Sequence, residues 1–163
     1  SRPGARLWEE TRSLNLEGSG SRFPVELIAF ESAAGLPDNA GWQVDWGSQD
    51  LDRPAMGTLR LLVNADREKV AGAVLDPERD EESRSVVSAI RYDVARRLIF
   101  SALRNDDFCE RFPDFPEHSL GAALADLISL HFGSGNLDAL MRQARHQAER
   151  LDTRIQDAMH IFD

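Results

Sequence analysis

The spacing of apolar residues changes at Asn64, and this change limits the chain to a fold with strands first and helices after them. Before Asn64, apolar side chains alternate with polar ones in three short segments, which is typical of half-buried β-strands. After it, apolar residues recur every three or four positions, as in amphipathic helices. The 163 residues suffice for one domain with a substantial core. We predict a single α+β domain over residues 23–163, preceded by a flexible N-terminal arm or linker over residues 1–22.

The three predicted strands lie within residues 22–32, 41–47 and 58–64. The second has the clearest pattern: Trp42, Val44 and Trp46 share one face, and we expect both tryptophans to be largely buried. Turn-forming residues fill the two connections between the strands. These observations predict a three-stranded antiparallel meander with one apolar face.

About four helices are predicted after the sheet. Asp76 is the expected cap before the second helix, with Pro77 at its first position, and Glu81 and Glu82 suit its positive end. Gly133 is a normal stop for the third helix. The predicted ranges are Arg67–Val74, Ser83–Arg104, Glu117–Phe132 and Leu137–Phe162, and the second range is the most apolar.

The last predicted helix has heptad-like spacing, with apolar residues alternately four and three positions apart. At 1.5 Å per residue it would be roughly 39 Å long, enough to span the domain or to project from it. One interpretation is an ordinary helix packed on its own domain. The other is a seam for a protein partner or for a homodimer, and its interface residues would be Leu137, Met141, Ala144, Ala148, Leu151, Ile155 and Phe162.

Composition narrows the classes of function. The formal net charge of −9 argues against nucleic-acid binding, which needs Lys and Arg to displace counterions from phosphates. No apolar run approaches the roughly 20 residues of a membrane helix, so no membrane association is expected. The single cysteine, Cys109, excludes an intrachain disulfide and favours the cytoplasm. Lys69 is the only lysine, which favours a bacterial protein from a GC-rich genome, and Ser1 in place of Met favours a processed chain or a piece of a larger protein.

Asp66 is the first candidate for chemistry, because it lies between an apolar strand and a helical pattern. A short carboxylate in this position caps free backbone N–H groups at the start of a helix. The end of a strand at the start of a helix is also a place where ligands bind. The cap is the preferred interpretation, and Asn64 can serve the same turn.

Glu26 and Asp45 are two further weak catalytic candidates. Both fall on the less apolar face of the predicted sheet, where a pair of carboxylates could share acid–base work. Solvated strand positions explain them equally well, and Arg60 on the third strand could pair with either. A pocket that contained two of the three carboxylates would favour an enzyme.

The remaining candidates do not form a recognisable motif. His118, His131, His146 and His160 do not have the spacing of a metal site. Acidic neighbours raise the pKa of the Cys109 thiol, which is the wrong direction for a nucleophile. Residues 132–136, FGSGN, read as a turn between helices with Ser134 or Asn136 as a cap, because a phosphate loop needs a longer glycine pattern with a lysine. We expect neither a metal nor a cofactor.

Two hypotheses for function follow. The first is a non-catalytic protein-interaction or assembly module of a bacterial cytoplasmic protein. The alternative is a small-molecule hydrolase or ligand-binding domain that uses Glu26, Asp45 or Asp66. An exposed apolar stripe on the last helix would favour the first hypothesis.

Overall fold

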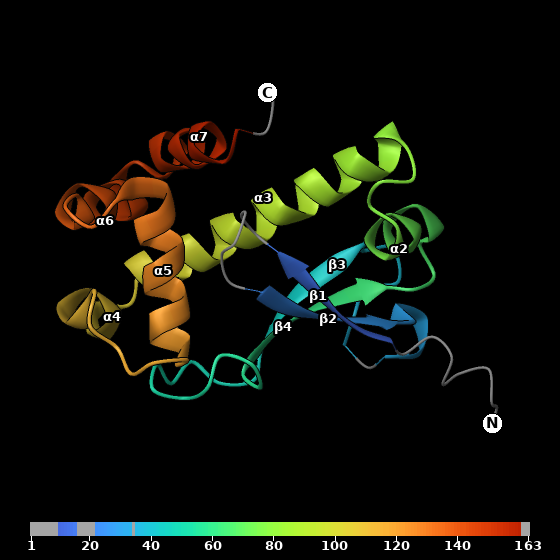
Figure 1. The fold of residues 1–163 in the computed structure, drawn as a ribbon, viewed down its shortest axis with the longest axis horizontal. Coiled ribbons are helices and arrows are strands. Elements are labelled where there is room, and N and C mark those ends of the chain that lie inside the picture. The colour runs from blue at the N-terminus through green and yellow to red at the C-terminus, as the bar shows by residue number, and fades with distance from the viewer. Residues whose placement is uncertain (1–9, 16–21, 34, 161–163) are drawn as a thin grey trace.

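The computed structural model describes residues 10–15, 22–33 and 35–160, which form an α+β fold with a mixed sheet followed by six α-helices (Figure 1). The strands are β1 (Glu10–Asn15), β2 (Arg22–Ile28), β3 (Trp42–Trp46) and β4 (Leu59–Asn64), and a short 3-10 helix, η1 (Phe30–Ser32), follows β2. The helices are α2 (Glu68–Leu75), α3 (Glu81–Leu103), α4 (Asp106–Arg111), α5 (Leu120–Phe132), α6 (Leu137–His146) and α7 (Ala148–Met159). None of the helices in this part of the chain combines the length and apolarity that a membrane span requires.

The sheet is mixed, so the predicted antiparallel meander is wrong. Its strand order is β1-β2-β4-β3, with β2 parallel to β4 and β3 antiparallel to β4. Consecutive strands are often neighbours, which is the assumption behind the prediction. Here β4 enters between β2 and β3 because it is apolar on both faces: Leu61 and Val63 are buried on one, and Leu62 on the other. A strand of this kind buries most surface in the middle of a sheet.

Residues 10–15 of the predicted arm form β1, which pairs antiparallel with β2 from Glu10 opposite Leu27 to Asn15 opposite Arg22. The rest of the predicted arm, residues 1–9 and 16–21, lies outside the described residues. The described part of the arm is therefore one edge of the sheet.

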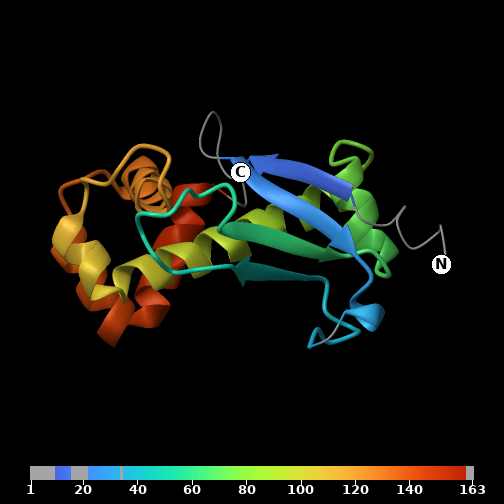
Figure 2. The ribbon, with the colours of Figure 1, turned by 90° about the horizontal axis from the view of Figure 1, so that it is seen from below.

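Helix α3 connects the two halves of the molecule. Its N-terminal half lies against α2 and one face of the sheet, and α4 to α7 gather around its C-terminal half (Figures 1 and 2). The helix predicted to be the most apolar contributes a buried stripe, since five of its residues are at most 2% exposed: Val87, Ile90, Val94, Leu98 and Ala102. The predicted cap of this helix, Asp76, is wrong. Asp80 is the N-cap instead, and its side chain accepts a hydrogen bond from the Ser83 backbone N–H at 2.7 Å. Glu81 and Glu82 lie in the first turn as expected.

The two tryptophans of β3 are partly buried and pack against the core, in line with the prediction that they are largely buried. They point to the side of the sheet that α3 covers, and the Trp42 indole N–H donates to Asp93 of α3 at 2.8 Å. Because β3 is the last of the described strands in the sheet order, these residues have a described neighbouring strand on one side only.

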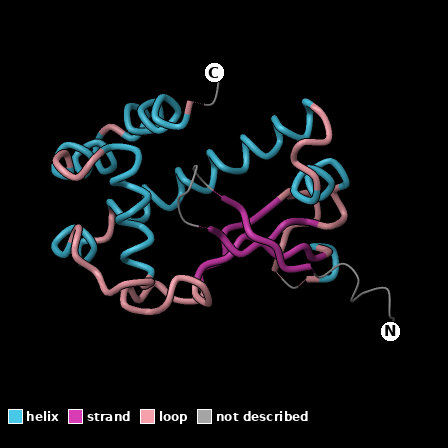
Figure 3. Tube along the Cα trace, in the orientation of Figure 1, coloured by secondary structure: helices cyan, strands magenta, loops and turns pink. Residues whose placement is uncertain are grey.

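The predicted C-terminal helix is broken into α6 and α7 at Gln147, whose backbone is not helical (φ −141°, ψ 56°; Figure 3). Residues on both sides of the break pack into the chain's own core. Leu140, Ala144, Leu151 and Ile155 have no exposed surface, whereas Leu137, Met141 and Ala148 are half-buried. Phe162 lies outside the described residues. The seam hypothesis therefore loses its central positions to packing within the chain.

Candidate anion-binding pocket

Asp66 is not a helix cap, so that prediction is wrong. Helix α2 begins at Glu68, Arg67 occupies the N-cap position, and no side chain caps the helix there. Asp66 itself is exposed.

Asn64 organises the turn instead, from a fully buried position. Its Oδ1 accepts from the backbone N–H of Phe30 at 3.2 Å and of Asp66 at 3.0 Å. Its Nδ2 donates to the carbonyls of Asp38 and Ala40, each at 2.9 Å. One side chain therefore joins β4 to the loop after β2 and to the start of α2.

Glu26 and Asp45 meet across Arg60 on the face of the sheet that points away from α3. The Arg60 guanidinium donates to each carboxylate at 2.8 Å, and the hydrogen bond to Asp45 is the main reason that its pKa is raised. Arg60 is about half exposed, so the three groups form a solvated ion network of modest strength. Asp66 lies beyond the opposite end of β4, and none of the three carboxylates lines the pocket described below. The condition that would favour an enzyme is therefore not met at this pocket.

The other predicted candidates stay apart. Within residues 10–15, 22–33 and 35–160, no group of three or more His, Cys, Asp or Glu side chains is placed to hold a metal ion. Burial raises the pKa of the Cys109 thiol, the direction expected, although the main cause is burial and not acidic neighbours. The turn between α5 and α6 is confirmed, with Gly133 in the left-handed region (φ 75°), but Asn136 makes no side-chain cap.

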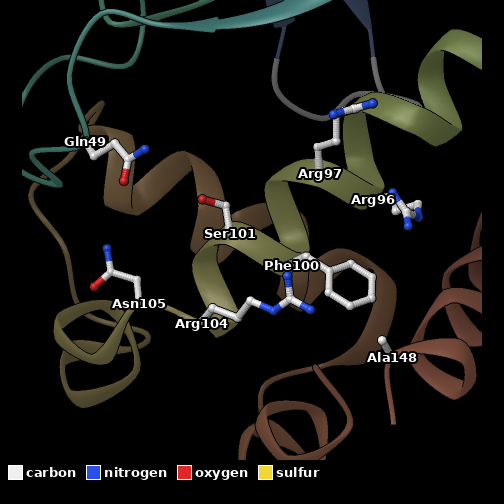
Figure 4. Close-up of a pocket in the computed structure, with 8 residues that line it drawn as sticks. All are labelled: Gln49, Arg96, Arg97, Phe100, Ser101, Arg104, Asn105 and Ala148. Atoms are coloured by element: carbon white, nitrogen blue, oxygen red, sulfur yellow. The ribbon is translucent and has the colours of Figure 1, made fainter. Parts of the chain in front are cut away.

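A pocket of about 630 Å³ lies on the C-terminal half of α3, between the β3–β4 loop and the start of α7 (Figure 4). Among the described residues, polar and cationic side chains dominate its lining, and no carboxylate contributes to it. The lining residues are Gln49, Arg96, Arg97, Phe100, Ser101, Arg104, Asn105 and Ala148. In a chain of net charge −9, this is a local concentration of positive charge.

Arg104 is held in this pocket by the break between α6 and α7. The last carbonyls of a helix have no partner within it, and Gln147 ends α6 by donating to Gln143. The Ala144 carbonyl accepts instead from Arg104, through Nε at 3.2 Å and Nη2 at 3.1 Å. This contact is with a neutral group, so the helix break orients the guanidinium without cancelling its charge.

Phe100 fixes the orientation of Arg104 and of Arg96. The guanidinium carbons lie 5.0 and 5.4 Å from the centre of its ring, within the range of cation–π attraction. Figure 4 shows the Arg104 guanidinium beside the ring. Arg96 also donates from Nε to Asp152 of α7 at 3.1 Å, and Tyr92 donates to the same carboxylate.

Arg97 lies at the rim and points away from the Phe100 ring (Figure 4). Its Nε donates at 2.9 Å to Asp93, the carboxylate that also accepts from Trp42. Asn105 is the N-cap of α4, and its Oδ1 accepts a hydrogen bond from the Phe108 N–H at 3.1 Å. Its Nδ2 group carries two N–H donors that it can still offer to the pocket.

The charges of the pocket do not cancel. Asp152 offsets Arg96 and Asp93 offsets Arg97, but within the described part of the chain Arg104 forms no ion pair with a carboxylate. Ala148 is the first residue of α7, whose N-terminus has no side-chain cap and carries partial positive charge. The pocket therefore presents donors and one uncompensated cation, the properties of a site for an anionic group.

Sequence reasoning missed this pocket because no local motif encodes it. The arginines of α3 are visible at positions 96, 97 and 104, and helical spacing places 96, 100 and 104 along one face. The helix break that positions Arg104 has no Gly or Pro to signal it.

Comparison with models of known protein families, with curated proteins and with solved structures finds no significant match for this chain. The fold class alone does not imply a function. The chemistry of the pocket is therefore the basis on which a function can be proposed.

Proposed function

We propose that this chain is a non-catalytic interaction module that binds an acidic segment of a partner protein. The binding site is the pocket lined by Arg96, Arg97 and Arg104, called the arginine pocket below. Arg104 is the anchor of the site, and Arg96 and Arg97 supply further N–H donors. We place the module in the cytoplasm, where a single reduced cysteine is ordinary.

The observation that carries the proposal is that the Arg104 guanidinium is held in place without a described carboxylate partner. Its guanidinium lines an open pocket and is oriented by a carbonyl and an aromatic ring, yet it has no carboxylate partner among the residues described. Holding a cation in place before binding reduces the entropy lost when a ligand arrives. The net charge of −9 would repel an extended polyanion such as nucleic acid, whereas a short acidic segment meets mainly the local field.

The test is a fluorescence-anisotropy titration of a labelled peptide of alternating Glu and Gly residues with the intact chain. We expect saturable binding that weakens as salt is raised. Loss of one charged hydrogen-bonding group costs about 1.5–3 kcal/mol, so Arg104→Gln should weaken binding by about tenfold or more. Arg97→Gln, at the rim, should weaken it less.

Arg84→Gln is the matched control, because Arg84 is an exposed arginine of the same helix outside the pocket. It should bind the peptide as tightly as the parent chain. Circular dichroism of each variant checks that the fold is retained. Equal loss of binding in Arg84→Gln and Arg104→Gln would mean that general charge, and not the pocket, attracts the peptide, and the proposal would fail.

A further inference from the structure

Strand β3 has one edge that is not paired with any other strand of the described structure. It is the last strand in the sheet order, with β4 on one side only (Figure 2). Alternate residues of an antiparallel pair turn their backbone N–H and C=O groups toward the partner strand. Either the odd-numbered or the even-numbered residues of β3 therefore bond to β4, and the backbone groups of the other set face outward.

Two hydrogen bonds fix this parity. The Asn64 N–H donates to the Gly41 carbonyl at 2.8 Å, and the Gly47 N–H donates to the Thr58 carbonyl at 2.6 Å. Odd-numbered residues from 41 to 47 therefore bond toward β4.

The even-numbered residues Trp42, Val44 and Trp46 turn their backbone groups outward. No hydrogen bond from these outward groups is present in the described structure.

The edge also lacks several of the features that normally prevent strand addition. Strands are protected by proline, lysine, a bulge or a covering segment. Residues 42–46, WQVDW, contain neither Pro nor Lys, and their pairing with β4 is continuous from Trp42 to Trp46. The edge is therefore a template for another strand.

We propose that a second copy of this chain adds to the edge, β3 against β3, in antiparallel register centred on Val44. Val44 then faces the partner's Val44, and Trp42 faces the partner's Trp46. Each such pair of outward-facing residues exchanges two backbone hydrogen bonds. The two sheets become one continuous sheet across a twofold axis.

The side chains in this register are self-complementary. The aromatic pairs stand on the half-buried face beside the core, where cross-strand aromatic contacts are favourable. On the other face, Asp45 lies opposite the partner's Gln43, so a carboxylate meets an amide and no like charges face each other. Asp45 also keeps its own counter-ion, Arg60, at 2.8 Å.

This interface does not depend on the arginine pocket. It also differs from the heptad seam, whose central residues are buried within the chain. A dimer formed here would leave Leu151 and Ile155 in place.

Val44→Pro tests the backbone contact, with Val44→Ala as the matched control. The Val44 N–H faces outward, so proline removes no bond to β4, and prolines are tolerated at such edge positions. Sedimentation velocity from about 1 µM to 1 mM should show reversible dimerisation of the parent and of Val44→Ala. Val44→Pro should stay monomeric throughout.

Gln43 tests the register without altering the backbone, since its side chain is exposed. Gln43→Arg places a cation opposite the partner's Asp45 at two symmetric positions, and Gln43→Asp places a like charge there. From about 0.2–1 kcal/mol per pair, the dimer dissociation constant should fall about 2- to 30-fold for Gln43→Arg and rise by a similar factor for Gln43→Asp. These two Gln43 variants test the proposed β3–β3 dimer even if Val44→Pro fails to fold.

Amide hydrogen exchange provides an independent readout. The Val44 amide should exchange more slowly as protein concentration rises, whereas the Gln43 amide, bonded to β4, should be protected at every concentration. A parent chain that is monomeric at 1 mM, or a dimer equally strong in both Gln43 variants, would overturn the proposal.

Discussion

Replacing Asn64 tests whether one buried amide, and not the neighbouring carboxylate, organises the turn from sheet to helix. The Asn64 side chain makes four hydrogen bonds, two accepted and two donated, and has no exposed surface. Asp66, two residues later, is exposed. Asn64→Ala and Asp66→Ala should therefore have very different effects on stability.

The size of the stability loss follows from the backbone groups that lose a hydrogen-bond partner when Asn64 is replaced. In Asn64→Ala, the Phe30 N–H loses its partner in a buried position, which costs about 1–3 kcal/mol. The Asp66 N–H and the carbonyls of Asp38 and Ala40 are nearer to water and cost about 0.5–1.5 kcal/mol each. We expect a loss of about 2.5–7.5 kcal/mol, a large share of the roughly 5–15 kcal/mol that stabilises a domain. Asp66→Ala should cost less than about 0.5 kcal/mol.

Urea unfolding followed by far-ultraviolet circular dichroism measures both free energies of unfolding. Asn64→Asp is an informative companion, because it keeps the shape of the side chain but replaces both amide donors with an acceptor. It should lose at least as much stability as Asn64→Ala at pH 7. Comparable losses for Asn64→Ala and Asp66→Ala would refute the reasoning.

Three other predictions concern the core, the thiol and a helix cap. Leu151→Glu combined with Ile155→Glu should unfold the chain, because both side chains are fully buried; a folded protein by circular dichroism would contradict this. Cys109 should react with iodoacetamide at pH 7.5 several-fold more slowly than glutathione, because burial raises the pKa of its thiol; an equal rate would be inconsistent with it. The hydrogen bond from the Ser83 N–H lowers the pKa of Asp80, so its contribution to stability is present at neutral pH and is lost as pH falls through the folded pKa. Asp80→Ala should thus lower the urea midpoint at pH 7 but hardly at about pH 2, and a constant difference would argue against this cap.

The succession of strands first and helices after them could be predicted, since it depends on local periodicity, but β1 and α4 were missed. Helix α3 lies within two residues of its predicted ends. The place of β4 in the sheet could not be read in the same way, because which strand occupies the centre depends on both of its faces together. Leu62 is the signal that was underused: it adds an apolar position on the face otherwise occupied by Arg60 and Asn64.

The candidate site was harder to predict because it depends on a break that local sequence does not signal. The heptad spacing is the same on both sides of Gln147, yet two shorter helices let Leu140 and Leu151 both reach the core. The break frees the Ala144 carbonyl, and that carbonyl orients Arg104. Asp66 illustrates the opposite error, since a residue favoured by local propensity was displaced by Asn64, three of whose four side-chain contacts come from distant segments.

Direct observation of the arginine side chains is the most decisive test of the arginine pocket. In a nitrogen-15 NMR titration with the Glu–Gly peptide, the Nε–H signal of Arg104 should shift along a saturable curve that matches the anisotropy curve. The Arg84 signal, on the same helix and outside the pocket, should stay in place. An unchanged Arg104 signal at a concentration where the peptide is bound would show that the acidic segment binds elsewhere and would contradict the proposed site.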